Sequence, residues 1–314
     1  MSAPIQLRMG GYGPPTTSFS RALKFIGDRL TAELGQAVEI KYVWNIMDLG
    51  YRAEDILWLV EHGLLTLGYQ SSSYLTERVP ELGVLDLPFL FPNETAARSA
   101  IDGALGEALA GKIEERVSYR VLGWFENGFR HLSNRLRPVH GPADLAGMRI
   151  RVLPSKVQAR TFALMGAVPM PMDLTQAIAL ITSSGIDAQE NPLTNTVTYG
   201  VHRFHRFHTL TSHFYISRPI FVHGPSFDAW PELVKAALRN AIADAVAWQR
   251  NLHVEEERDA RATIAAQGCE VIELTAADKA AFASVVRPLR QEAMPAFGAG
   301  LLKLAEGAQS CSPD

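Results

Sequence analysis

Short apolar runs alternate with helical patterns along the first half of the chain. Runs of four to eight apolar or β-branched residues predict β-strands, and the turn residues around them mark the strand ends. The predicted strands are residues 5–9, 37–44, 64–69, 84–91, 119–125, 148–153 and 269–274. Their alternation with helical segments is typical of an α/β protein.

Two helices are predicted between the first three strands. The first has apolar residues at helical spacing from Phe19 to Leu34, and Thr16, Thr17 and Ser18 precede it as candidate N-caps. The second, within residues 53–63, ends at Gly63, a typical residue just beyond a helix.

A much longer helix is predicted over residues 231–266, which contain no Gly and no Pro after Pro231. At 1.5 Å per residue it would be about 50 Å long, more than the diameter of a small domain. We therefore expect this helix to brace two domains. The length of 314 residues fits two domains as well.

Composition and charge exclude some functions. The chain is 47% hydrophobic and 20% charged, as in ordinary soluble proteins, and its net charge of −3 gives no reason to expect nucleic acid or an anionic membrane as partner. No window of 18 apolar residues predicts a membrane-spanning helix. The N-terminal sequence MSAPIQLRMGGYG lacks the features of a signal peptide, which leaves a cytoplasmic protein or an exported chain whose signal has been removed.

The two cysteines, Cys269 and Cys311, leave two interpretations open. In an oxidising compartment they could close a loop of about 40 residues and add about 3–4 kcal/mol of stability. In the cytoplasm they would be two ordinary thiols.

The loop at residues 10–18, GGYGPPTTS, lies between a strand and a helix, but it matches neither common phosphate-binding motif. We expect it to bring Tyr12 and backbone amides to a cleft, where a helix N-terminus favours an anion.

Catalysis and metal binding have little support. A group of histidines invites a metal, but their spacing makes convergence poor and neighbouring arginines would repel a cation. These histidines are His202, His205, His208 and His213. No G-x-S-x-G motif is present, and neither cysteine has a setting that activates a thiol. We expect no catalytic residue, no metal and no cofactor.

The arginines carry more information. Arg130 closely follows the strand that ends at Phe125, and Arg149 and Arg151 alternate with Ile150 and Val152. By the two-residue period of a strand, Arg149 and Arg151 share one face. Either this strand lies at a sheet edge with both arginines in solvent, or at least one of them reaches a cleft.

Five segments, taken in order, resemble the DctP-like solute-binding proteins of tripartite ATP-independent periplasmic (TRAP) transporters. They are LGVLDLPFLF (82–91), GWFENGFRHLSN (123–134), GMRIRVLPS (147–155), MGAVPMPM (165–172) and SSGIDAQENPL (184–193). The resemblance implies a two-lobed α/β periplasmic-binding-protein fold with a ligand cleft between the lobes. We expect lobe I to comprise residues 1–123 and about 213–250, and lobe II residues 124–212 and about 251–314.

The resemblance also implies roles for three residues. Arg151 would pair with an organic carboxylate, since a guanidinium offers two parallel hydrogen bonds that a lysine cannot reproduce. Arg130 would be a second, supporting cation, and Asn191 would donate its amide to the ligand. Gln189 and Glu190 would orient the loop without touching the ligand.

Further ligand contacts are predicted from the turns and aromatic residues around the cleft. They are Tyr12, Gln70, Ser72, Phe125, Met172 and Phe214. Trp44 and Tyr215 could add to an aromatic lining, although Trp44 and Phe125 fit the core equally well. The turn PMPMDLTQ departs from the family, whose members often have an acidic or aromatic residue after P-x-P.

The resemblance implies a periplasmic protein that binds a small organic carboxylate and delivers it to TRAP transporter membrane subunits. Because family members are exported, it also implies that a signal peptide has been removed. We expect a monocarboxylate with a hydroxyl, oxo or aromatic group. The alternatives are a ligand-binding subunit of a sensory receptor, or an enzyme on the same scaffold.

Overall fold

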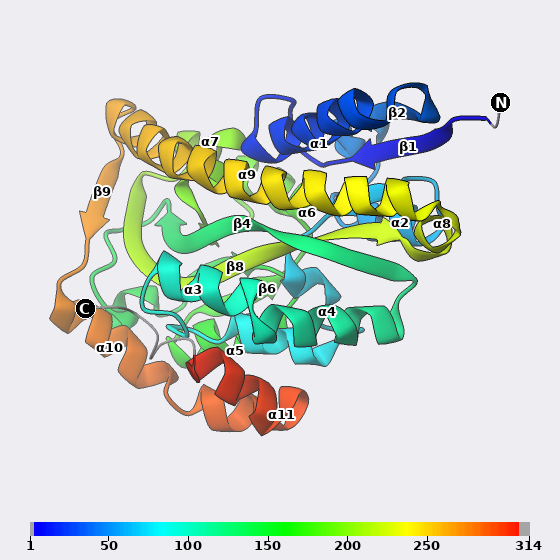
Figure 1. The fold of residues 1–314 in the computed structure, drawn as a ribbon. Coiled ribbons are helices and arrows are strands. Elements are labelled where there is room, and N and C mark those ends of the chain that lie inside the picture. Colours follow the sequence, from blue (N-terminus) through cyan, green and yellow to red (C-terminus); the bar gives the residue numbers. More distant parts are fainter. Residues whose placement is uncertain (1–2, 308–314) are drawn as a thin grey trace. The chain divides into compact units, whose positions relative to one another are not determined.

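The computed structural model describes residues 3–307 (Figure 1). The chain divides into two compact units. Both units draw on three separate stretches of chain. Unit 1 comprises Met1–Ser71, Ala110–Glu126 and Ser217–Val254, and unit 2 comprises Ser72–Leu109, Asn127–Ile216 and Glu255–Asp314. Cys311 lies outside the described residues, so its pairing with Cys269 stays a prediction.

Unit 1 contains the N-terminal β-α-β arrangement. Its strands are β1 (Ile5–Gly10), β2 (Val38–Val43), β3 (Leu67–Tyr69), the first half of β4 (Tyr119–Asn134) and the second half of β8 (Phe207–His223). β1 pairs in parallel with β2 and β3, and β3 pairs antiparallel with β8. The helices wholly within this unit are α1 (Ser18–Leu34), α2 (Asp55–Glu61) and α8 (Gly224–Ala229). Thr17 caps α1, because its hydroxyl accepts a hydrogen bond from the Ser20 amide at 3.2 Å.

Unit 2 is built on a mixed sheet. Its strands are the second half of β4 (Tyr119–Asn134), β5 (Arg149–Val152), β6 (Val168–Pro171), β7 (Ala188–Asn191), the first half of β8 and β9 (Glu270–Glu273). β7 pairs antiparallel with β4 and in parallel with β5, which pairs in parallel with β6. β8 pairs in parallel with β9.

Helices and short 3-10 turns surround the sheet of unit 2. The helices are α3 (Glu94–Asp102), α5 (Lys156–Leu164), α6 (Leu174–Thr182), α7 (Leu193–Thr198), α10 (Ala276–Val286) and α11 (Leu289–Gly307). The 3-10 turns that matter for the site are η3 (Ser72–Leu75) and η4 (Pro80–Asp86). The apolar core includes Ile150 and Val152 of β5, Phe162 of α5 and Phe214 of β8.

The predicted long helix is confirmed as α9 (Glu232–Ala266), drawn yellow to orange in Figure 1. It contributes residues 232–254 to unit 1 and residues 255–266 to unit 2. α4 (Ala104–Arg116) likewise contributes to both units. Within residues 3–307, no helix combines the length and the apolarity that a membrane crossing requires.

The predicted strand at residues 84–91 is wrong. This segment ends the 3-10 turn η4 and continues as irregular chain, in which Phe89 adopts a positive φ of 54°. It is buried on several sides, so its apolar run has the same appearance as a strand buried on both faces. The Phe89 amide instead donates to the His213 carbonyl at 2.8 Å.

β8 was not predicted, although it is the longest strand in the described part of the chain. Polar residues interrupt its apolar pattern, and Pro219 within a run argues against a strand. η4 packs against α5 and α11, and residues 72–109 belong to unit 2. The expected bounds of the two lobes stay a prediction.

Candidate functional site

The strand register of unit 2 places Arg151 and Asn191 on one face of the sheet. Arg151 of β5 lies directly beside Gln189 of β7. Gln189 and Asn191 are two residues apart in the same strand, so their side chains point to the same side. The two residues to which the resemblance gives a role in carboxylate binding therefore lie on the same face of the sheet of unit 2.

Arg151 is 1% exposed and has only neutral hydrogen-bond partners. Its Nε and Nη2 donate to the Met172 carbonyl at 3.2 and 3.0 Å, and Nη2 also donates to the Tyr74 hydroxyl at 3.1 Å. Within residues 3–307, no carboxylate forms an ion pair with Arg151. An uncompensated buried cation is costly, so this guanidinium favours an incoming anion.

Arg130 is equally buried, but its charge is compensated. Its Nε and Nη2 form a two-pronged ion pair with the Glu190 carboxylate, with 2.7 Å between Nη2 and Oε1. Nη2 also donates to the Glu190 carbonyl at 2.8 Å. Burial acts to raise the pKa of Glu190, but the Arg130 charge prevails and holds that pKa below its usual value. A supporting role of Arg130 toward the ligand stays a prediction.

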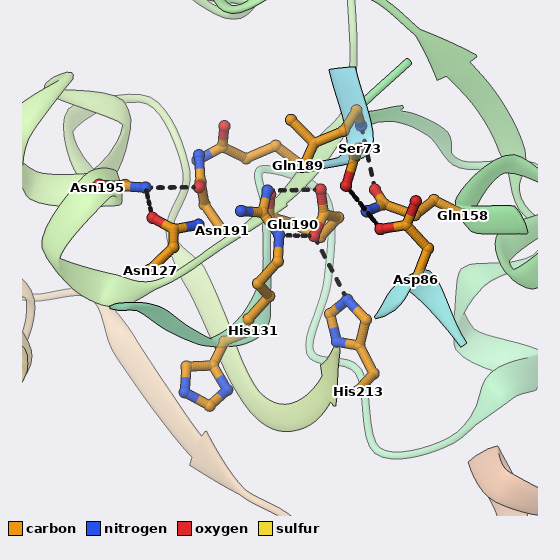
Figure 2. A network of polar contacts seen from close by, with 12 residues as sticks. Ser73, Asp86, Asn127, His131, Gln158, Gln189, Glu190, Asn191, Asn195 and His213 are labelled. Carbon is orange, nitrogen blue, oxygen red and sulfur yellow. Dashed lines mark hydrogen bonds and ion pairs between the residues drawn. The ribbon is translucent and has the colours of Figure 1, made fainter. Parts of the chain in front are cut away.

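His213 lies beside this ion pair, with its Nε2 3.7 Å from Glu190 Oε2 (Figure 2). Burial lowers the pKa of His213, which favours the neutral imidazole. Its Nδ1 is 2.6 Å from the Thr211 hydroxyl. The Arg130–Glu190 pair with a neutral His213 has no net charge to offer a ligand.

Asn191 is held by a relay of amides. Asn195 Nδ2 donates to Asn191 Oδ1 at 3.1 Å and to Asn127 Oδ1 at 3.0 Å, as Figure 2 shows. With this assignment of the amides, Asn191 Oδ1 is engaged, and its Nδ2 donates to none of the described residues. The Asn191 side chain is thus oriented as a hydrogen-bond donor, which suits a carboxylate or hydroxyl oxygen.

Glu257 of α9 fixes the segment that follows Asn191. Its carboxylate accepts hydrogen bonds from the Leu193 amide at 3.2 Å, from the Thr194 amide at 2.8 Å and from the Thr194 hydroxyl. These groups begin α7, and a carboxylate there satisfies amides that have no partner within the helix. Burial raises the pKa of Glu257.

Arg149 has a structural role. It pairs with Asp187 at 3.0 Å, and Arg135 pairs with the same carboxylate at 2.6 Å. The hydrogen bonds from Arg149 lower the pKa of Asp187 to about 2, although burial opposes them. Of the two arginines that share a face of β5, only Arg151 lacks a carboxylate within the described chain.

The grouped histidines bond to the protein itself. His205 Nδ1 is 2.9 Å from the Ser133 hydroxyl, and His208 Nε2 is 2.9 Å from the His205 carbonyl. Burial lowers the pKa of His205 to about 3 and that of His208 to about 4. These side chains are neutral members of the interior of unit 2.

Three of the other candidates lie in unit 1. The ring centroids of Tyr12 and Phe125 are 5.3 and 5.7 Å from that of Tyr69. The guanidinium of Arg218 lies over this aromatic cluster, 5.2 Å from the Tyr12 ring centroid. Gln70 is tied to its own unit, since its Nε2 donates to the Ala53 carbonyl at 2.8 Å. Ligand contacts of these residues stay predictions.

The remaining candidates, Ser72, Met172 and Phe214, lie in unit 2. Phe214 packs in the apolar core, and the Met172 side chain packs with Ala177 and Ile181. The Met172 carbonyl, as the acceptor for Arg151, has the clearest part in the site. Ser72 is fully buried, and its hydroxyl has no hydrogen-bond partner among residues 3–307. Direct contact of these side chains with a ligand stays a prediction.

Comparison with known proteins identifies the family. The family described as bacterial extracellular solute-binding protein, family 7 (DctP) matches residues 10–295. The chain belongs to this family. The predicted resemblance to DctP-like solute-binding proteins is therefore confirmed.

Two relatives and one solved structure illustrate the match. A solute-binding protein of Verminephrobacter eiseniae is 30% identical over 250 residues, which cover 80% of this chain and 74% of that one. The 2,3-diketo-L-gulonate-binding periplasmic protein YiaO of Escherichia coli is 29% identical over 307 residues, or 96% and 92% of the two chains. A TRAP periplasmic solute-binding protein of Chromohalobacter salexigens with bound D-glucuronate has a TM-score of 0.90 at 25% identity, covering 98% and 100%.

The match to solved TRAP solute-binding proteins confirms the predicted two-lobed α/β fold class. For this family 7 protein, the sequence patterns did not predict that Tyr74, Asn195 and Arg218 contact the candidate site residues. Asn195 left a signal, because it lies four residues after Asn191 and just beyond Pro192, where a helix would bring the two together. Tyr74 left none, because its contact with Arg151 spans 77 residues.

Proposed function

We propose that this family 7 protein binds a small organic carboxylate through Arg151, in the periplasm, and delivers it to TRAP transporter membrane subunits. The observation that carries the proposal is the uncompensated charge of Arg151, which is 1% exposed. A carboxylate would supply the missing negative charge and accept two parallel hydrogen bonds. Family membership supports the transport role.

We propose a hydroxylated or oxo-substituted monocarboxylate as the ligand, with a six-carbon sugar acid as the first choice. Two proteins similar to this chain are described with such acids, 2,3-diketo-L-gulonate and D-glucuronate. The amide of Asn191, oriented as a donor by Asn195, suits an oxygen of the same ligand. Arg151 would hold the carboxylate and Asn191 a neighbouring oxygen.

We infer that the protein catalyses no reaction on this ligand. Glu190, the acid nearest to Asn191 in the sequence, is engaged by Arg130, and that pairing makes it a poor proton carrier.

The alternative role as a subunit of a sensory receptor differs from the transport role only in the protein that the ligand-bound form contacts. Copurification with TRAP membrane subunits supports delivery to a transporter, and capture by a receptor instead would contradict it.

Calorimetry with matched ligands tests the binding proposal. D-glucuronate should bind, and its uncharged methyl ester should bind far more weakly because it brings no charge to Arg151. Succinate tests whether a second carboxylate is tolerated, and we expect weaker binding. The variant Arg151→Met should lose D-glucuronate binding while remaining folded. Equal binding of the acid and its ester, or undiminished binding by the variant, would contradict the proposal.

A further inference from the structure

Three polar side chains form a small buried cluster in unit 2 beside the residues described above. Ser73, Asp86 and Gln158 are each fully buried, and Figure 2 shows them hydrogen-bonded to one another. The Ser73 hydroxyl donates to Asp86 Oδ1 at 2.6 Å. Gln158 Nε2 donates to the same oxygen at 2.9 Å and lies 3.0 Å from the Ser73 hydroxyl. We call these three residues the buried clamp.

The buried clamp joins the turn η3 to the strand that carries Arg151. Gln158 Oε1 accepts a hydrogen bond from the Leu153 amide at 3.3 Å, and Leu153 lies just beyond β5. The Thr76 hydroxyl donates to the Pro154 carbonyl at 3.2 Å and so provides a second connection. Residues 73–76 are therefore fixed against the end of β5.

Tyr74, which follows Ser73 in the sequence, contacts Arg151, the proposed carboxylate-binding residue, directly. Its hydroxyl oxygen accepts hydrogen bonds from Arg151 Nη2 and from the Leu174 amide, both at 3.1 Å. The phenol thus connects the guanidinium to the first residue of α6. Because a hydrogen bond weakens steeply with misalignment, the position of Tyr74 affects how the Arg151 guanidinium is oriented.

Stability alone does not explain this arrangement. Within the described chain, Asp86 has no ion-pair partner, and the nearby Glu190 carboxylate acts on it unfavourably. A buried carboxylate without a cation destabilises the folded state, whereas a well-packed apolar residue would not. A polar network that lowers stability has a better explanation if it orients a functional group.

We propose that the buried clamp positions Tyr74, and through it the Arg151 guanidinium, so that Ser73, Asp86 and Gln158 help to set the affinity of the carboxylate site. The inference rests on the proposed function of Arg151. It makes the three clamp residues positioning residues, none of which touches the ligand.

Hydrogen exchange at the Leu174 amide, in the protein without ligand, provides a test that needs no binding. Tyr74→Phe removes the acceptor of that amide and should accelerate its exchange. Ser73→Ala should accelerate it as well, although Ser73 does not contact Leu174. Thr209→Val is the control, because it removes another buried hydrogen bond of unit 2, to the Val139 carbonyl at 3.0 Å, away from the clamp. The Thr209→Val control should lower the free energy of unfolding. Its exchange at the Leu174 amide should accelerate no more than exchange at other amides of unit 2.

Calorimetric titration with D-glucuronate completes the test. Tyr74→Phe and Ser73→Ala should each weaken binding by about 3- to 30-fold, while Thr209→Val binds as the wild type does. If Ser73→Ala matches the control in both measurements, the positioning role is overturned. If the wild type binds no D-glucuronate but Tyr74→Phe and Ser73→Ala both accelerate Leu174 exchange, the proposed ligand class fails and the positioning of Tyr74 by the buried clamp stands.

Discussion

Unit 2 contains two arginines, Arg130 and Arg151, that are equally buried and differently compensated. Each is 1% exposed. Arg130 meets a carboxylate within the protein, that of Glu190, whereas Arg151 meets a carbonyl and a phenol. Burial alone would rank the two as equal candidates for a ligand. Charge compensation separates them, because only an uncompensated buried cation gains strongly from an added anion.

The strand β7 accounts for this difference through its alternation. Consecutive side chains of Gln189, Glu190 and Asn191 point to opposite faces of the sheet. Glu190 meets Arg130, while Gln189 and Asn191 share the face of their neighbour Arg151. A short strand thus supplies an internal anion to one arginine and neutral polar groups beside the other.

The largest expected effect is on the free energy of unfolding, when the charges of Arg130 and Arg151 are removed one at a time. Arg130→Met leaves Glu190 buried without its partner and should lower the free energy of unfolding by about 3–5 kcal/mol. Arg151→Met removes an uncompensated charge, so the ligand-free protein should change by less than about 1 kcal/mol or become more stable. Urea denaturation of both variants without ligand measures this. Equal losses would show that Arg151 has a compensating partner after all.

Ligand affinity should show the opposite order, with the larger loss on substitution of Arg151. Arg151→Lys keeps the charge but cannot hold both carboxylate oxygens in one plane, so D-glucuronate should bind about 30- to 1000-fold more weakly, or about 2–4 kcal/mol. Arg130→Lys should weaken binding less. Calorimetry on the two variants makes the comparison. Near-normal binding by the Arg151 variant, with a large loss in the Arg130 variant, would assign the anchor to Arg130.

The strand period predicted much of this site from the sequence. It placed Arg149 and Arg151 on one face, and the resemblance singled out Arg151 and Asn191. The period could not distinguish the two arginines, because the partner of Arg149 is Asp187, 38 residues further along. The Arg130–Glu190 pair spans 60 residues, and no local pattern reveals such a contact.

The buried clamp was beyond sequence reasoning for a related reason. Asp86 lies in a segment predicted as a strand, and its apolar neighbours favour that interpretation in the absence of tertiary contacts. Its partners lie 13 residues before it and 72 residues after it. Periodicity predicts which face a side chain occupies, but the partner on that face depends on how distant segments pack.

Asp86 extends the comparison to an uncompensated anion. Burial raises its pKa from 3.8 to about 6, against hydrogen bonds from Ser155, Ser73 and Gln158, and the Glu190 charge adds to the rise. At a pH below the pKa of Asp86 in the unfolded state, the folded and unfolded states both hold the proton, and no stability is lost. As pH rises from about 4 to about 6, the unfolded state releases the proton first, and the folded state loses up to about 3 kcal/mol of stability.

Asp86→Asn isolates this contribution, because the amide has nearly the same shape and does not titrate. The unfolding free energy of wild type minus that of the variant should fall by up to about 3 kcal/mol between pH 4 and pH 7. Subtraction cancels the titration of other groups, including Glu190 and His213, as far as the substitution leaves them unchanged. Urea denaturation at several pH values measures the difference. A difference that is flat with pH would mean that Asp86 has the same pKa in the folded and unfolded states, which would contradict an uncompensated buried carboxylate.

The smallest expected effect concerns the Asn191 amide, which lies on the same face of the sheet as Arg151. Asn195→Ala removes the group that engages Asn191 Oδ1, so the Asn191 amide can rotate and present its oxygen to the ligand instead of its N–H. One misoriented hydrogen bond should weaken D-glucuronate binding by about 3- to 10-fold. Asn127→Ala, which removes the second acceptor of Asn195 and leaves the bond from Asn195 to Asn191 in place, should have a smaller effect. Calorimetry with Asn191→Ala as reference ranks the three. If Asn195→Ala binds normally while Asn191→Ala does not, the donor orients itself and the relay of amides is only structural.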